Sequence, residues 1–564
     1  MQENRKELIG LLTLLVVLGL LYTHPVYDPD FWWHLRGGEW IWKNLSIPVA
    51  DTFSFTTYNG TVSPADEIRT RYILSQYWLS QPVFYLSWRW LGPLGVILLR
   101  AGLLLLSVFA LFRFLIRKKT EFSVALSLSA LTGLHLAIFT GERPQLFSFL
   151  FSVLFLSGIE YLRAGEGEPK TRQRLIFLLP LLTLVWANMH SSAMVAWIIG
   201  LPYLIYFLHR QLTDRQEQRK WRNLTIIVGI SLAITLLNPN TYHGFFLTFN
   251  LFQSKHLSMN TEFMSPFLQM KDMRLIYPSY LILLVVTAFM IFSRHALLLH
   301  RVLTVIFLGM SLTAMRFTPF FVLLAPMLIG PGLQQAVSRS RRRVEIVLII
   351  LAAAACLLQL SQSRSELLTQ GVNHGDFPQQ AVKFLKVNNP QGHMFNLFEW
   401  GGYLQWHLPE KKTFIDSRAL RLAVYEDYDA IIAPSPVRPL WRDLLDTYRI
   451  DIILISGVRS ELVYMLLKDP DWEPVYADQI SVIFLRKPHN LVAVPAAVVL
   501  EKITESLSRL VSEDPENITW IKRLAAAYYH RKDYRNALLF YQKALALSPD
   551  DPYLLQMTGL LKNR

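Results

Sequence analysis

The chain has 564 residues, of which 52% are hydrophobic and only 17% are charged. A soluble domain carries about 25% charged residues, so this composition predicts an integral membrane protein. The formal net charge of +14 falls entirely in residues 1–360, which hold 32 Lys and Arg against 18 Asp and Glu, while residues 361–564 hold 24 of each. Because the basic excess lies in short loops between apolar runs, it is typical of a topology signal and excludes nucleic acid as its explanation. The single cysteine excludes an intrachain disulfide and a thiol metal cluster.

Apolar runs predict a polytopic α-helical membrane domain over residues 1–361. A helix needs roughly 20 mostly apolar residues to span a bilayer, with some tolerance. About eleven runs qualify. They lie at 8–24, 93–115, 121–140, 145–162, 173–189, 192–208, 223–237, 276–293, 296–314, 317–333 and 344–361. The first run is interpreted as an uncleaved anchor, because Tyr22, His24 and Pro25 stand where a small-residue cleavage site would lie.

Lys and Arg recur before the first run and at every second connection after it. They include Arg5 and Lys6, Arg113 and Arg117 to Lys119, Lys170, Arg172 and Arg174, Arg210 to Arg222, Arg294 and Arg301, and Arg339 to Arg343. Cytoplasmic loops of membrane proteins carry such an excess. The pattern therefore predicts a cytoplasmic N-terminus, with residues 362–564 on the external face. In a bacterial inner membrane that face is the periplasmic one.

The first external connection, residues 24–92, is far longer than a turn and holds seven of the fifteen tryptophans. Loops of this length that are rich in large side chains are usually functional rather than disordered. Two stretches, near 29–43 and 67–91, are predicted to be helices that lie in the membrane interface with most indole rings toward lipid.

The acid pair Asp28-Pro29-Asp30 opens this connection and allows two interpretations. Locally, Asp28 caps the helix, Pro29 takes its first position and Asp30 suits its first turn. Carboxylates are costly at this depth, however, and His34 lies close by, so the pair is also a candidate general base or divalent-cation site facing a lipid-borne substrate. Supporting acids follow at Asp51, Asp66 and Glu67.

The stretch DPDFWWHLRGGEWIWKNLSIPVADTFSFT, residues 28–56, resembles the first external loop of the GT-C glycosyltransferases. These multi-span enzymes take sugars from polyprenyl-phosphate carriers at the outer face of a membrane. Asp28 and Pro48 fall at about the spacing of the acid and the proline in the aminoarabinose and protein-mannose transferase branches. Those branches usually carry Asp-Glu, so the resemblance leaves either Asp28 or Asp30 as the base. Many members of the group also place an acid before the second interfacial helix, and Gln76 and Glu67 are the candidates for that place here. Metal dependence differs between branches and stays open.

Further polar groups are predicted at the same external face. They are Glu142 to Gln145, Asn188 to Ser191, Asn238 to Asn240 with His243, and Arg316. Single polar groups at helix ends usually snorkel or cap, but several clusters at one face favour a site. A guanidinium matches phosphate oxygens, so Arg143 and Arg316 are predicted to bind the donor phosphate, with His34 and His190 as further phosphate-binding candidates. The loop 238–275 is predicted to be a lid.

Residues 372–490 are predicted to form a small external α/β domain. Strand-like runs HMFNLF, KTFIDS, IDIILIS and SVIFLRK alternate with amphipathic stretches at 376–388 and 438–449. The run FNLFEWGGYLQWHLPEKKTFIDSR also resembles the external domains of the same bacterial transferases. Asp416 and Arg418 end a predicted strand, where ligand contacts are common but ion pairs are equally often structural.

The last segment, 495–564, is predicted to be a tetratricopeptide-like helical unit. Its repeat positions over 518–551 are Leu524, Ala525, Tyr528, Ala537, Tyr541, Ala544 and Pro549. One repeat cannot bury its own face, so helices near 495–512 and 552–561 must flank it. It is either a C-terminal cap or a docking surface for a protein partner or acceptor.

The whole pattern predicts a transferase that moves a glycosyl unit from a polyprenyl-phosphate donor to a protein, lipid or glycan acceptor on the external face. Asp28 or Asp30 would deprotonate the acceptor hydroxyl, and Arg143, Arg316 and His190 would stabilise the leaving phosphate. The competing hypothesis is a non-catalytic scaffold, or a carrier of lipid-linked saccharide. A carrier should show internal repeats and charged, broken spans near the midplane, and the acids here cluster at the surface instead.

Overall fold

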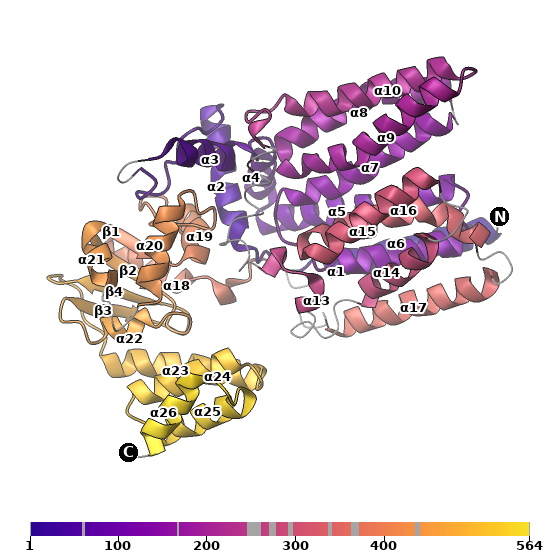
Figure 1. Cartoon of the computed structure of the whole chain (residues 1–564). Coiled ribbons are helices and arrows are strands. Elements are labelled where there is room, and N and C mark those ends of the chain that lie inside the picture. The colour runs from indigo at the N-terminus through magenta and orange to yellow at the C-terminus, as the bar shows by residue number, and fades with distance from the viewer. Residues whose placement is uncertain are drawn as a thin grey trace. The chain divides into compact units, whose positions relative to one another are not determined.

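The computed structural model describes residues 2–58, 62–165, 168–244, 247, 261–269, 278–291, 297–336, 341–362, 371–434 and 440–562. The chain divides into two compact units (Figure 1). The first unit comprises Met1–Val49 and Arg71–Val372, and the second comprises Ala50–Thr70 and Asn373–Arg564. The middle of the long first loop therefore belongs with the C-terminal third of the chain.

The first unit is built of long helices that run side by side (Figure 1). Its helices are α1 (Gln2–Tyr22), α2 (Pro29–Asn44), the end of α3 (Pro64–Ser75), α4 (Ser80–Leu91), α5 (Pro93–Arg117), α6 (Phe122–Leu136), α7 (Gln145–Ala164), α8 (Pro169–Met189), α9 (Met194–Thr213), α10 (Gln218–Ala233), α13 (Pro266–Gln269), α14 (Pro278–Ile291), α15 (Leu298–Thr313), α16 (Thr318–Ala336) and α17 (Arg341–Gln362). Short 3-10 turns connect them at η1 (Ser191–Ala193), η2 (Ile234–Leu236), η3 (Thr261–Phe263) and η4 (Met315–Phe317).

Each apolar run predicted from the sequence largely coincides with one of these helices. Within the described residues, four helical stretches are both long and apolar enough to cross a membrane: Pro93–Arg117, Gln145–Ala164, Ser191–Thr213 and Met315–Leu333. Shorter apolar helices lie at Phe122–Leu136, Pro278–Ile291, Leu298–Thr313 and Glu345–Ser361. The chain is thus an integral membrane protein with a mainly helical fold. The number of spans stays a prediction.

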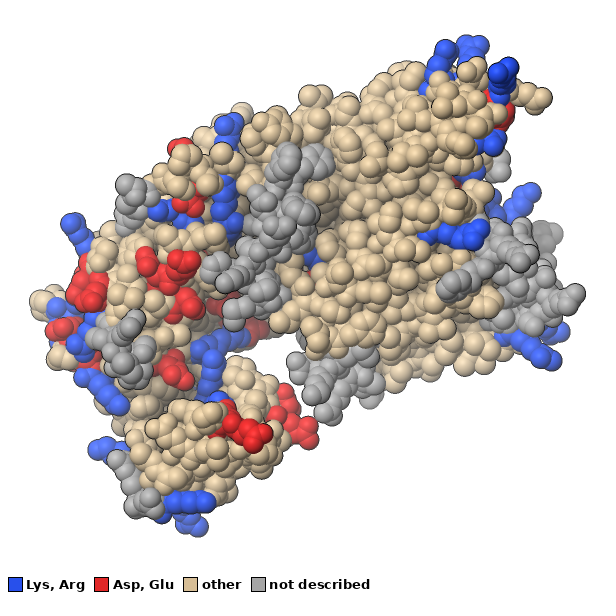
Figure 2. Space-filling model, in the orientation of Figure 1, with Lys and Arg blue, Asp and Glu red and all other residues tan. Residues whose placement is uncertain are grey.

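Charge is distributed as a membrane requires (Figure 2). The visible flank of the helical unit is a broad expanse of uncharged side chains, and Lys and Arg gather at the end where the N-terminus lies. Exposed apolar side chains on this unit include Phe177 on α8, Ile205 on α9 and Val285 on α14. Large exposed apolar areas are rare on soluble monomers, so these flanks face lipid.

The first loop forms helices as predicted at α2, but the predicted helix 67–91 is in fact two helices, α3 and α4. The break occurs because the Leu79 amide, which a continuous helix would bond to Ser75, donates to the Asn188 carbonyl over 3.3 Å. The tryptophans are also less exposed to lipid than predicted. Trp32 is fully buried and lies edge-on to Trp88, whereas Trp42 and Trp90 are exposed.

The second unit joins a four-stranded sheet to a helical C-terminus (Figure 1). The strands β1 (His393–Asn396), β2 (Ile450–Ile455), β3 (Trp472–Ala477) and β4 (Val482–Arg486) take the order β1-β2-β4-β3, with β1 parallel to β2 and the other pairs antiparallel. Its helices are α18 (Gln379–Asn388), α19 (Gly401–His407), α20 (Leu422–Ile432), α21 (Leu440–Thr447), α22 (Leu462–Leu466), α23 (Ala496–Glu513), α24 (Ile518–His530), α25 (Tyr534–Leu547) and α26 (Pro552–Lys562), with 3-10 turns η5 (His374–Asp376) and η6 (Phe398–Trp400).

Three of the four predicted strands are confirmed, and KTFIDS was wrongly predicted. Its Thr413 makes an isolated bridge to Ser54, with the amides of Phe55 and Thr413 donating to the carbonyls of Thr413 and Phe53 over 3.1 and 3.0 Å. Thr413 therefore pairs with the loop segment 50–70 instead of with a strand of the sheet. Strand β3 was missed because Pro474 interrupts its pattern.

One hydrophobic core runs from the sheet into the C-terminal helices. Ile453 and Phe484 of the sheet, Ile503 of α23 and Leu524 of α24 belong to the same buried cluster. Helices α24 and α25 pack on each other through the small and aromatic positions expected of a helical repeat, including Ala525, Ala537, Tyr541 and Ala544. Helices α23 and α26 pack against this pair, as predicted.

Candidate active site

The acid pair, Asp28 and Asp30, lies at the start of α2, just after the connection from α1. Asp28 is the N-cap of α2, and its Oδ1 accepts the Asp30 amide over 2.9 Å, with Pro29 at the first helical position. The local capping interpretation is therefore confirmed. Capping uses only one carboxylate oxygen, however. The other oxygen, Oδ2, accepts from Arg143 Nε over 2.6 Å.

Arg143 gathers three carboxylates around one guanidinium. Its Nη2 lies 3.2 Å from Asp30 Oδ2, and its Nη1 lies 2.5 Å from Glu262 Oε1. Asp30 also accepts from Trp33 Nε1 over 3.2 Å. Burial raises the pKa of the Asp28 carboxyl, and the Arg143 charge opposes this rise. Three carboxylates therefore share the Arg143 guanidinium.

Gly141 permits this arrangement. A Cβ atom added at residue 141 would lie 2.3 Å from Asp28 Oδ2, far inside any real contact distance. Only glycine at position 141 therefore lets the turn between α6 and α7 pass the Asp28 carboxylate without displacing it. This close approach places the carboxylate at the same turn that carries Arg143.

A second ion pair holds the chain that leads into Asp28. The side chains of Arg100 and Glu142 are fully buried and bond to each other. Glu142 Oε2 also accepts the Asp28 amide over 3.1 Å, and Arg100 donates to the carbonyls of Tyr22 and His24. Burial raises the pKa of Glu142 to about 7, against the pull of Arg100. Because a buried charge must be paired, these residues fix the path of the loop on which Asp28 stands.

A cavity of about 240 Å³ opens beside Asp28 and Arg143. It is lined by Tyr27, Asp28, Pro29, Ile138, Phe139, Gly141, Arg143, Gln145, Leu146, Phe149, Glu262, Met315 and Arg316. The volume lies just below the roughly 300 Å³ lower end of small-molecule pockets. Carboxylates and two arginines share this space with apolar walls. Arg316 also contacts the Phe263 ring, 4.5 Å from its centroid.

The predicted histidines, His34 and His190, do not line this cavity and pack against Tyr77 instead. The Tyr77 ring stands between His34 at 4.9 Å and His190 at 5.6 Å, measured between ring centroids. His190 Nδ1 accepts the Ser192 amide over 2.9 Å, and burial lowers the pKa of His190 to about 3, helped by Arg316. His190 is therefore neutral. His34 is buried on the face of α2 that meets Gln81 of α4.

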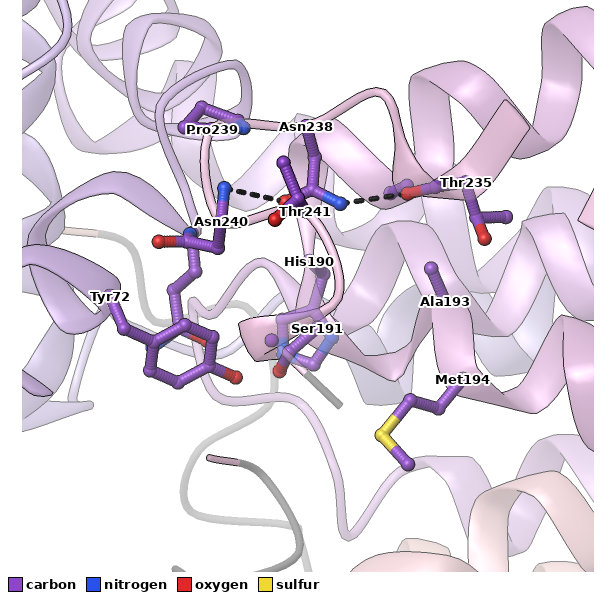
Figure 3. A pocket seen from close by; sticks show the side chains of 13 residues that line it. Tyr72, His190, Ser191, Ala193, Met194, Thr235, Asn238, Pro239, Asn240 and Thr241 are labelled. Carbon is purple, nitrogen blue, oxygen red and sulfur yellow. Dashed lines mark hydrogen bonds between the residues drawn. The ribbon is translucent and has the colours of Figure 1, made fainter. Parts of the chain in front are cut away.

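His190 borders a smaller cavity of about 40 Å³ (Figure 3). Figure 3 shows Asn238 to Thr241 folded over it, with the Asn240 amide donating to Asn238 Oδ1 over 2.8 Å. Asn188 Nδ2 donates to the Leu237 carbonyl over 2.9 Å. The structure thus brings together the predicted polar clusters 188–191 and 238–240. Most of the predicted lid 238–275 lies outside the described residues, which here cover 238–244, 247 and 261–269.

The remaining predicted acids lie in the second unit. Arg418 bonds Asp416 through Nε and Nη2 over 2.7 and 2.6 Å, and Asp51 over 3.3 Å, with all three side chains buried. Burial acts to raise the pKa of Asp416, but Arg418 reverses this and holds it below the usual value. Asp51 further accepts from the Thr57 hydroxyl. The network joins the loop segment to the sheet domain, while Glu67 is exposed on α3.

Sequence reasoning missed Arg100 and Glu262. Arg100 stood out as a charge within an apolar run, which in membrane proteins marks a paired group. Glu262 gave no such signal, since only the fold brings it to Arg143, 119 residues away in the chain. As for a divalent cation, the described residues contain no group of three or more His, Cys, Asp or Glu arranged to hold one. Arg143 already places a positive charge among the three carboxylates, so these residues do not fit a divalent cation.

Fold and site together define an integral membrane protein with an acid-lined cavity. Among solved structures, the chain is similar to the oligosaccharyltransferase of Archaeoglobus fulgidus, crystallised with a disulfide-tethered acceptor peptide containing the NVT sequon. The likeness covers 86% of this chain and 75% of that chain, with a TM-score of 0.49 and 11% sequence identity. Similarity at this level does not assign a family. No model of a protein family matches the sequence, and no curated protein does.

Proposed function

We propose that the chain is a GT-C-type glycosyltransferase that moves a sugar from a polyprenyl-phosphate-linked donor to an acceptor at the external membrane face. The observation that carries this proposal is the Asp28 carboxylate, held by Arg143 and Gly141 at the wall of a cavity that also contains Arg316. The loop motif of residues 28–56 points to the same chemistry.

Asp28 is the better candidate for the base. Both aspartates bond Arg143, but Asp28 lines the cavity, whereas Asp30 is not among the lining residues and also bonds Trp33. Burial raises the pKa of Asp28 and so makes its carboxylate a stronger proton acceptor. The hydrogen bonds from Arg143 and the Asp30 amide orient the Asp28 carboxylate.

In the proposed reaction the acceptor hydroxyl gives its proton to Asp28 while its oxygen attacks the anomeric carbon of the donor. The bond from that carbon to the phosphate oxygen breaks, and its electron pair leaves with the polyprenyl phosphate. Attack opposite the leaving group inverts the anomeric centre. Arg316 stabilises the growing phosphate charge, because a guanidinium binds phosphate oxygens in pairs. Arg143, already held by three carboxylates, positions the base rather than the phosphate.

We place the chain in a bacterial inner membrane, with Arg5 and Lys6 in the cytoplasm and the second unit in the periplasm. The gathering of basic side chains at the N-terminal end of the helical unit supports this orientation (Figure 2). We also propose about eleven spans, one for each apolar run that coincides with a helix. The helical pair α24 and α25 is proposed as a tetratricopeptide-like surface that meets a protein partner or acceptor.

The proposal is tested by measuring transfer by the purified full chain from a panel of polyprenyl-phosphate sugars. Wild type should transfer at least one sugar, and Arg316→Lys should raise the KM for that donor because the single ammonium loses the paired contact. Arg301→Lys serves as the matched control, since Arg301 is on α15 away from the cavity lining. The absence of transfer from every donor, or equal KM values for both variants, would contradict the proposal.

A further inference from the structure

An apolar groove runs between α14 and α17 of the first unit, with a volume of about 560 Å³. It is lined by Leu281, Ile282, Val285, Val286, Phe289, Leu333, Arg343, Val347, Leu348 and Leu351. Among these lining residues Arg343 is the one charged side chain. The groove therefore has a hydrocarbon wall and a single cationic end.

Helix α17 forms both the cationic end of the groove and part of its apolar wall. Arg343 lies in the first turn of α17, and Leu351 is eight residues further along, which is about 12 Å at the rise of an α-helix. Val285 and Phe289 on α14 are 71% and 58% exposed, and they face the same groove as Val347. Side chains this apolar and this exposed need lipid rather than water as their neighbour.

The charge at the groove end selects the kind of lipid. Arg342 and Arg343 are exposed at the start of α17, and the sequence from 339 to 343 contains four arginines. Basic clusters beside membrane helices attract anionic headgroups, and a helix N-terminus adds a partial positive charge. We propose that this groove binds one anionic glycerophospholipid, with its phosphate at Arg343 and an acyl chain between α14 and α17.

This lipid is distinct from the proposed sugar donor. Arg316 of the acid-lined cavity lies in η4, immediately before α16, whereas Leu333 near the other end of α16 lines the groove. Fifteen residues separate Thr318 from Leu333, which is about 22 Å along the helix. A phosphate at Arg343 therefore cannot be the phosphate at Arg316, and the groove stands whether or not the chain transfers sugars.

Native mass spectrometry of the purified full chain in detergent tests the site, with dioleoyl phosphatidylglycerol and dioleoyl phosphatidylcholine as probes. Wild type should retain one phosphatidylglycerol in preference to phosphatidylcholine. Arg343→Gln should weaken that retention about fivefold, the effect of one basic residue at a membrane surface. Arg342→Gln is the matched control, because Arg342 is exposed next to Arg343 but does not line the groove, and this change should weaken retention less.

Leu351→Trp should also weaken retention, because the larger ring fills the groove, and Val285→Trp does so from the opposite helix if the first variant fails to fold. Equal loss in the two arginine variants would reduce the effect to diffuse surface attraction and overturn the proposal. Equal retention of the two lipids would overturn it too. So would displacement of the lipid by millimolar inorganic phosphate, which would show that the groove takes no part.

Discussion

The contact between Gly141 and Asp28 gives a sharp test of how the candidate base is positioned. In Gly141→Ala the new Cβ would begin 2.3 Å from Asp28 Oδ2, and an ordinary contact starts at 3.4 Å, so the two atoms must separate by about 1.1 Å. Oδ2 is the oxygen that bonds Arg143 over 2.6 Å, so the displacement lengthens that ion pair. A shift of about 1 Å at a reacting group costs roughly a hundredfold in rate.

We therefore expect Gly141→Ala to lower kcat by about a hundredfold with little change in the KM for the donor. The control is Gly102→Ala on α5, where an added Cβ meets no atom within 4 Å. That variant should keep wild-type transfer and gain slightly in thermal stability, since alanine favours a helix over glycine. Both variants are compared in turnover and in Tm as purified full chains. Equal turnover in the two variants would refute the reasoning, because the position of the Asp28 carboxylate would then not matter.

Three further predictions concern pH, the second unit and topology. Burial lowers the pKa of His190 to about 3. Between the unfolded pKa near 6.5 and that value only the unfolded chain binds the proton, so stability falls with falling pH by up to about 1.4 kcal/mol per unit. His190→Asn, which keeps an acceptor for the Ser192 amide, should lose less Tm between about pH 7 and pH 4.5 than wild type; an identical loss would contradict the assignment. Asp416→Asn should destabilise the second unit by about 3 kcal/mol, the lower end for a broken buried pair because Asp51 remains, and unchanged thermal unfolding of that unit would contradict this. Cysteines placed at Lys118 and Arg342 should resist an impermeant thiol reagent on intact cells, whereas one at Lys543, which is exposed on α25, should react, and the reverse pattern would overturn the orientation.

Much of the helical unit is predictable because apolar runs mark buried or lipid-facing helices whatever their partners are. The Asp-Pro pattern likewise predicted the start of α2, because capping and the proline at the first position depend only on adjacent residues. Predictions from such local signals hold because they do not depend on which distant residues pack nearby.

Features that depend on distant residues were not predictable. Thr413 lies in a run of strand-like composition, yet it pairs with Ser54 of the first loop, 359 residues earlier. Arg143 was predicted to bind phosphate, and nothing in the sequence indicated that Glu262 would join the aspartates around it. The charge state of a group follows from its neighbours in space, so a motif can identify Asp28 without revealing what holds it.

Replacement of the acid pair tests the central claim most directly. Asn caps a helix nearly as well as Asp, and Arg143 keeps two of its three carboxylates in either variant, so Asp28→Asn and Asp30→Asn should leave insertion intact and lower Tm only slightly. The amide cannot accept the proton, so Asp28→Asn should lower transfer by at least about a hundredfold, while Asp30→Asn should lower it less. Transfer is measured with the donor that wild type uses, beside donor binding as a check on the site. Full transfer by Asp28→Asn, with intact folding, would contradict the assignment of Asp28 as the base.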